Sequence, residues 1–290
     1  TAINSANPVL VNPEIVLSAG NSLNLPALDA NGNLVLNAGN GVVLSNAVNI
    51  NNNGNLTINA GDGSLEVLGI VTASGNVKVT ASDLEIFTTS ALLNIAGVLT
   101  LSDQADGNGI GLVTFQPGKF NFDINEFNTI IAGGIELLTT NEVTLVGDFS
   151  SVASLVPLTI NAPSMVMSGT TKMALGSDLN FADTNVDVNG GLDIDIGGQF
   201  TMNGELTATN TVSIDAFSGI TMGEPSSITT TGDPINIASQ TGDILLGLLN
   251  AGGSSVGITA TAGDILNNNG VFDDVTKSLT NIAVSYTHLR

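Results

Sequence analysis

The 290-residue chain contains no cysteine and no tryptophan, and only 4% of its residues are aromatic. The absence of cysteine excludes disulfide bonds and thiolate metal ligands. Because 42% of the residues are hydrophobic, the chain has too much apolar content for a disordered protein. We therefore expect a folded protein that is stabilised by its core alone.

Tyrosine, histidine and arginine occur once each, as Tyr286, His288 and Arg290. Residues 1–283 contain none of these three types, and selection for a site would not remove them everywhere else. The segment VSYTHLR is similar to the translation of the transposase mosaic end that is used to prepare sequencing libraries. We expect residues 284–290 to be adapter read-through and residues 1–283 to be an interior fragment of a longer protein.

Charged residues are scarce and mostly acidic, with 26 Asp and Glu against 5 Lys and Arg and a net charge of -21. This charge repels phosphate backbones, so nucleic-acid binding is not expected. No apolar stretch approaches the roughly 20 residues of a transmembrane helix. Without the C-terminal tail, a Ser-His-Asp triad and a histidine-bearing zinc site are unavailable. We predict no cofactor and no catalytic, cofactor-binding or metal-binding residue.

The chain does contain an internal repeat. Segments of alternating apolar and polar residues follow five glycines: GNLVLNA from Gly32, GNLTINA from Gly54, GNVKVTA from Gly75, GVLTLSD from Gly97 and GKFNFDI from Gly118. These glycines are 22, 21, 22 and 21 residues apart. A step of 21 residues returns between Leu158, Leu179 and Phe200, and between Ile244 and Ile265.

Alternation with a period of two predicts strands that bury one face. The predicted inward pairs are Leu34/Leu36, Leu56/Ile58, Val77/Val79, Leu99/Leu101 and Phe120/Phe122, each followed by a further short strand at Val42/Leu44, Leu65/Val67, Leu84/Ile86, Ile110/Leu112 and Ile135/Leu137. A fixed step is what a solenoid requires, because each coil stacks in register on the one before. We predict an all-β fold, a right-handed parallel β-helix (β-solenoid) with coils of about 21 residues, as a single domain over residues 1–283.

Three residue types have predicted structural roles in this repeat. The repeated glycines supply a positive φ at one corner of each coil. The asparagines that follow them, Asn33, Asn55 and Asn76, form a hydrogen-bonded ladder. A phenylalanine cluster (Phe115, Phe120, Phe122 and Phe127) marks either an aromatic stack in the core or a loop packed on the solenoid, and packing is favoured over stacking on a ligand.

Units such as GNLTINAGDGSLEV and GDILLGLLNAGGSSVGITATAGDILNN resemble the β-strand repeats of filamentous-haemagglutinin-like exoproteins. These are the large passengers of two-partner secretion and autotransporter systems, and the resemblance covers nearly the whole chain. Family members carry an N-terminal secretion domain with an Asn-Pro-Asn-Gly type signature. ANPVLVNPE matches half of it, at Asn7-Pro8 and Asn12-Pro13. The resemblance implies interior repeats without the secretion domain.

Only carboxylates could perform catalysis in residues 1–283. Asp193 and Asp195 in GGLDIDIGG lie two apart and therefore share a strand face, with Asp187 nearby. Paired carboxylates hydrolyse glycosides, and some right-handed β-helices cleave polysaccharides. The competing interpretation, which we favour, places both on the solvent side of a strand.

Two binding functions remain as alternatives. DQADGNG at 103–109 offers oxygen ligands for weak calcium binding but lacks the terminal glutamate of an EF-hand loop. Outward threonines suit an ice-binding solenoid: Thr57, Thr100, Thr144, Thr159 and Thr201. Val35, Lys78 and Asn180 interrupt that array.

The sequence favours a non-enzymatic structural and adhesive shaft of a large secreted bacterial surface protein, located at the cell surface. The expected partners are the outer-membrane secretion machinery and a host or neighbouring-cell surface. End-to-end self-association of the fragment is a further expectation, because exposed strand edges pair readily. A polysaccharide-active enzyme and an ice-binding solenoid are the alternatives.

Overall fold

The computed structural model describes residues 9–87, 92–104, 107–151, 155–268 and 282–283. The chain is a β-solenoid built almost entirely from parallel strands, as the periodicity predicts. Its residues group into two compact units, Thr1–Asn141 (unit 1) and Glu142–Arg290 (unit 2). The interpretation of residues 1–283 as one domain stays a prediction.

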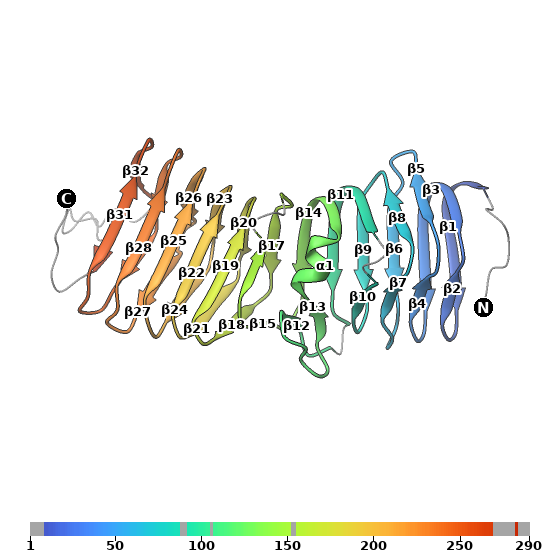
Figure 1. Ribbon diagram of the computed structural model, residues 1–290, viewed down its shortest axis with the longest axis horizontal. Helices are drawn as coiled ribbons and strands as arrows, with labels where there is room; N and C mark the ends of the chain where they lie inside the picture. The colour runs from blue at the N-terminus through green and yellow to red at the C-terminus, as the bar shows by residue number, and fades with distance from the viewer. Residues whose placement is uncertain (1–8, 88–91, 105–106, 152–154, 269–281, 284–290) are drawn as a thin grey trace. The chain divides into compact units, whose positions relative to one another are not determined.

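The strands of unit 1 form three stacked rows. The first row contains β5 (Val48–Asn51) and β8 (Ile70–Ala73), the second β6 (Leu56–Asn59) and β9 (Val77–Thr80), and the third β2 (Leu23–Leu25), β4 (Val42–Leu44), β7 (Leu65–Val67) and β10 (Leu84–Ile86). Four long strands pair along both of the first two rows: β1 (Val9–Ala19), β3 (Leu28–Ala38), β11 (Leu92–Ser102) and β14 (Ile130–Leu138). Figure 1 shows strands of the third row lying side by side.

Unit 2 also has three rows, and nearly every coil contributes one strand to each. The first row contains β17 (Leu158–Asn161), β20 (Leu179–Ala182), β23 (Gln199–Met202), β26 (Gly219–Met222), β29 (Ile244–Leu246) and β32 (Ile265–Asn267). The second contains β15 (Glu142–Val146), β18 (Ser164–Ser168), β21 (Asn185–Asn189), β24 (Glu205–Ala208), β27 (Ser227–Thr230), β30 (Leu248–Asn250) and β33 (Ile282–Ala283). The third contains β16 (Phe149–Ser151), β19 (Thr171–Leu175), β22 (Leu192–Ile196), β25 (Val212–Ala216), β28 (Ile235–Ser239) and β31 (Val256–Ala260).

Strand register confirms the predicted step. In unit 1, Leu34 pairs with Leu56, Leu56 with Val77 and Val77 with Leu99. In unit 2, Leu158 pairs with Leu179, Leu179 with Phe200 and Ile244 with Ile265. Except for Ile265, which is 49% exposed, these side chains are at most 2% exposed, so the core is a set of mostly aliphatic, methionine and phenylalanine rows that run across successive coils.

The prediction for the segment at Gly118 is wrong. Leu99 pairs with Ile135, not with Phe120, so this coil is 36 residues long. Phe120 lies in β13 (Phe120–Phe122), which pairs with β12 (Ile110–Leu112). Ile135 and Leu137 are buried residues of a strand, as predicted, but this strand is the long β14 and not a further short strand of the coil that contains Phe120. We call residues 103–129 the insertion.

Three of the four clustered phenylalanines pack in the core, which is one of the two predicted arrangements. Phe120, Phe122 and Phe127 are at most 1% exposed, and the rings of Phe122 and Phe127 meet edge to face with centroids 6.0 Å apart. Phe127 comes from α1 (Ile124–Asn128), a short helix in the insertion (Figure 1). Phe115 is 69% exposed, so the predicted packing is wrong for this residue. No helix in the described ranges is long and apolar enough to cross a membrane.

The predicted role of the repeated glycines is correct only in part. Gly32 and Gly118 have positive φ values of 118° and 79°, but Gly54, Gly75 and Gly97 do not. Glycine is required at these three positions because the backbone of the preceding coil lies very close to them. A Cβ atom on Gly54 would lie 2.1 Å from the carbonyl oxygen of Gly32, and one on Gly75 would lie 2.6 Å from that of Gly54. The absence of a side chain at these glycines therefore permits the close spacing of the coils at this corner.

The predicted asparagine ladder is present, and it links side chains to backbone. The N–H of Asn55 donates to Oδ1 of Asn33 (2.9 Å), that of Asn76 to Asn55 (2.8 Å) and that of Val98 to Asn76 (2.9 Å). Aspartate and asparagine side chains accept the same kind of bond between coils of unit 2. The backbone N–H of Lys172 donates to Asp148, that of Gln199 to Asp178, that of Glu205 to Asn185 and that of Asp264 to Asp243. Most of these bonds satisfy a backbone donor at or next to the start of a strand, while that of Val98 lies within the long strand β11.

Gly54→Ala should destabilise the protein by about 3 kcal/mol, because the added methyl group overlaps the backbone of the preceding coil. Gly20→Ala is the matched control, since a Cβ there meets no atom within 4 Å. Urea denaturation monitored by circular dichroism measures both. Equal midpoints for the two variants would contradict the close approach of the coils.

Candidate functional site

The structure places the predicted carboxylates Asp193 and Asp195 on the outward face of β22. Leu192, Ile194 and Ile196 alternate with them and are at most 2% exposed. This arrangement matches the solvent-side interpretation of the segment GGLDIDIGG.

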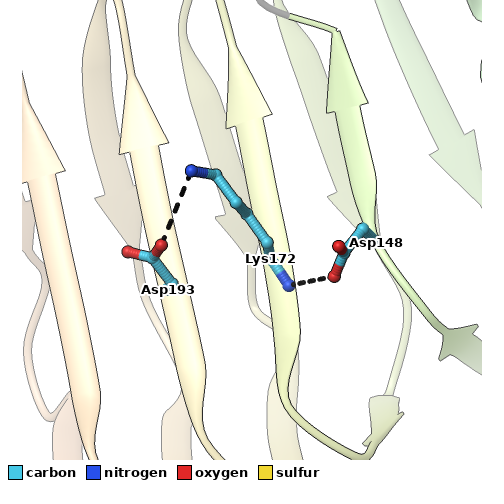
Figure 2. Close-up of polar contacts among 3 residues, drawn as sticks. All are labelled: Asp148, Lys172 and Asp193. Carbon is cyan, nitrogen blue, oxygen red and sulfur yellow. Dashed lines mark hydrogen bonds and ion pairs between the residues drawn. The ribbon is translucent and has the colours of Figure 1, made fainter.

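Asp193 takes part in an ion pair between neighbouring coils. Its Oδ2 lies 3.7 Å from Nζ of Lys172, whose own backbone N–H donates to Oδ1 of Asp148 at 3.0 Å (Figure 2). The side chains of Lys172 and Asp193 are 44% and 51% exposed, so the pair contributes little to stability. The positive charge of Lys172 partly offsets the negative charge of Asp193.

The other two carboxylates do not converge with Asp193 on one point. Asp195 lies directly opposite Asp215 of β25 in the parallel register. Asp187 lies on β21, in a different row, where it accepts a hydrogen bond from the hydroxyl of Thr207. The three residues are therefore dispersed over two faces of unit 2.

Asp103 of the predicted calcium segment has a structural role. Its Oδ2 accepts hydrogen bonds from the N–H of Gly109 (3.0 Å) and from Nδ2 of Asn141 (3.3 Å), while Asp106 lies outside the described residues. In the described part of the chain, no group of three or more His, Cys, Asp or Glu side chains is placed to hold a metal ion.

The outward threonines are interrupted where the sequence predicts. Lys78 lies between Thr57 and Thr100 in the register of unit 1, and Asn180 lies between Thr159 and Thr201 in unit 2.

The insertion holds a cluster of carboxylates that the sequence interpretation missed. The helix α1 starts with a capping box: Oδ1 of Asp123 accepts from the N–H of Glu126 (2.8 Å), and Oε2 of Glu126 accepts from the N–H of Asp123 (2.9 Å). Glu126 and Ile86 of β10 line the same cavity. The helix and a strand of the third row therefore lie close to each other at this point.

A second contact ties the insertion to the same strand. Oδ1 of Asp83, just before β10, accepts from the N–H of Asn121 in β13 and from the N–H of Leu84, both at 3.0 Å. This is the inter-coil bond of the asparagine ladder, made here to an inserted strand. The strand β13 thus lies between β12, with which it pairs, and β10, which it contacts.

Two neighbouring cavities share Glu85, Asp123 and Glu126 in their walls. One has a volume of about 560 Å³ and includes Phe87, which is 48% exposed. The other, of about 400 Å³, includes Asp83 and the exposed Phe115. The cavities combine acidic groups with aromatic surface.

Burial changes the proton affinity of this cluster. Loss of hydration, together with the smaller effects of the negative charges of Asp123 and Asp83, raises the pKa of Glu126 from 4.5 to about 8, and backbone donors only partly oppose this rise. Burial also raises the pKa of Asp83 above its ordinary value. The pKa of Glu85 is raised by burial and by the charges of Glu66 and Asp83. Glu126 is therefore a carboxyl group that holds its proton near neutral pH.

The sequence does contain a signal for this helix, because Asp123-Ile-Asn-Glu126 fits the capping-box pattern. No sequence pattern indicates that Glu126 also lies beside β10, about 40 positions earlier. Comparisons with protein-family models, with curated proteins and with solved structures give no match for this chain.

Asp195→Asn should stabilise the protein by about 0.5 kcal/mol at low ionic strength, because it removes a like charge opposite Asp215. Asp193→Asn is the control: it removes the partner of Lys172 and should be neutral or slightly destabilising. Urea midpoints in low and high salt measure both effects. A lower midpoint for Asp195→Asn at low salt would contradict the placement of these carboxylates.

Proposed function

We propose that the chain is a non-enzymatic structural and adhesive shaft of a large secreted bacterial surface protein, of the filamentous-haemagglutinin-like kind that its repeats resemble. It acts at the cell surface, after export by outer-membrane secretion machinery, and presents its faces to a host or neighbouring cell. The observation that carries this proposal is the unbroken parallel pairing between coils within unit 2, from β17 to β32 in the first row.

Stacked coils suit a mechanical role for a physical reason. Each coil of unit 2 is held to the next by short strands in three rows, and aspartate or asparagine side chains add bonds at several corners. Most interior positions are aliphatic, methionine or phenylalanine side chains that are almost fully buried. Removing a coil therefore breaks many backbone hydrogen bonds and exposes one layer of core.

Pulling the chain from its two ends should release one coil at a time. The absence of native cysteine allows defined attachment through Asn21→Cys and Ala262→Cys, both at exposed positions. Each coil of about 21 residues should add about 70 Å of contour length, given about 3.5 Å per extended residue. Single-molecule force spectroscopy measures this step.

The same tethered protein in concentrated denaturant is the control, and it should extend smoothly without steps. Smooth extension of the native protein, at the forces that stretch the denatured chain, would contradict the proposal that the chain is a mechanical shaft.

A polysaccharide-active enzyme is the second candidate, and Glu126 is the observation that favours it. A carboxyl group with a raised pKa can act as a general acid, and Glu85 and Asp123 share its cavity of about 560 Å³. A general acid beside an ionised carboxylate is the arrangement that glycoside hydrolysis requires.

This candidate predicts release of reducing ends from at least one member of a panel of soluble polysaccharides. Glu126→Gln should abolish the activity, while Glu14→Gln, an exposed carboxylate on β1, should retain it. Activity that survives Glu126→Gln, or no product from any polysaccharide between about pH 5 and pH 9, would remove this candidate.

A further inference from the structure

We propose that the insertion forms a docking site for a basic polypeptide segment, whose arginine side chains enter the two cavities beside α1 and lie between carboxylates and exposed phenylalanine rings. This inference goes beyond the shaft and the enzyme functions, and it depends on neither of them.

The proposed site consists of two cavities that share a wall. The larger, of about 560 Å³, and the smaller, of about 400 Å³, have Glu85, Asp123 and Glu126 in common. Both volumes lie in the range of cavities that bind ligands in proteins. Two neighbouring cavities suit two side chains of one extended segment, because alternate residues of such a segment point to the same side.

Exposed aromatic surface is concentrated at these cavities. In the part of the chain that the structure describes, three phenylalanines are exposed: Phe87 (48%), Phe115 (69%) and Phe217 (47%). Phe87 lines the larger cavity and Phe115 lines the smaller one, whereas Phe217 lines neither. Each cavity therefore has one exposed ring, and the face of an aromatic ring attracts a cation that is placed over it.

The charge of the walls decides which occupant fits. The described residues that line the two cavities include four carboxylate side chains and neither Lys nor Arg. Glu66 of β7 lies directly opposite Glu85 of β10, and the charges that act most strongly on Glu85 are those of Glu66 and Asp83. Like charges on neighbouring strands repel each other. A bound cation would relieve this repulsion.

The guanidinium group of arginine fits both features of the cavities. It is planar, it stacks on aromatic rings, and it donates hydrogen bonds to carboxylates in a fixed geometry. An anionic ligand would be repelled by the carboxylates and by the net charge of -21. An apolar ligand would remove the carboxylates from water without giving them a partner, which is costly. The walls therefore select a basic segment.

Fluorescence anisotropy of a labelled peptide tests the proposal. The peptide has two arginines separated by one glycine, and it should bind the full chain saturably at physiological ionic strength, where charges more than about 8 Å apart are screened. The same peptide with citrulline at both positions keeps the shape of arginine and loses its charge, so it should bind at least about tenfold more weakly. N-acetylarginine amide, which carries one guanidinium group, should also bind at least about tenfold more weakly.

Matched variants locate the binding. Glu85→Gln should weaken binding of the arginine peptide about fivefold, and Phe115→Ala about threefold, because each removes one contact of the guanidinium group. The controls make the same changes in unit 2: Glu205→Gln removes an exposed carboxylate of β24, and Phe217→Ala removes an exposed ring. Each control should change the affinity by less than about twofold, since distant charges are screened.

Three results would overturn the proposal. The first is equal binding of the arginine and citrulline peptides, or no binding of either. The second is an equal loss of affinity in Glu85→Gln and Glu205→Gln. The third is equal affinity for N-acetylarginine amide and the peptide, which would identify a small cationic ligand in place of a polypeptide. The first and third comparisons use the original chain, so they stand even if a variant fails to fold, and none of the three affects the force measurement of the shaft.

Discussion

The spacing between stacked coils is the constraint on which the rest of this structure depends. Parallel strands must lie about 4.8 Å apart to form hydrogen bonds, so every corner of a coil must fit within that distance of the corner below. Gly54 and Gly75 satisfy this steric requirement, because a Cβ would overlap a carbonyl group. Asn33 and Asn55 satisfy the polar requirement, because their side chains accept N–H groups that the corner leaves unpaired. Register between buried rows then follows, since Leu34, Leu56 and Val77 can only lie above one another.

The same constraint explains which features could be predicted from the sequence. Period-two alternation and a fixed step are one-dimensional signals, and they predict the solenoid and most of its strand register. The sequence pattern does not identify the third strand of each coil, such as β5 and β8, although these strands are as long as the predicted β6 and β9. They do not follow the repeated Gly-Asn pair that precedes β6 and β9. The segment at Gly118 misleads for another reason: it repeats the spacing and the alternation while belonging to an inserted strand. The sequence shows that glycine recurs at a corner, but the reason, close approach rather than positive φ, depends on the neighbouring coil.

The candidate carboxylates also differ in how well the sequence predicts their surroundings. Asp193 and Asp195 could be placed correctly because strand alternation decides which way they face. The properties of Glu126 could not be predicted, because its pKa depends on burial between two segments about 40 residues apart and on Asp83, which no local pattern connects to it. From the capping-box pattern alone we would expect an ordinary surface helix whose glutamate is exposed to water. Partial burial raises the pKa of the same residue to about 8.

An interruption of a solenoid therefore has a physical consequence. When a coil lengthens to 36 residues, the third row loses the strand that would have followed β10, and the exposed edge must be covered by something other than a standard coil. In this chain β13 of the insertion contacts β10, and the N–H of Asn121 donates to Oδ1 of Asp83 just before β10 at 3.0 Å. The regular coils and the interruption thus meet one requirement, that each strand edge be satisfied by the segment that lies above it.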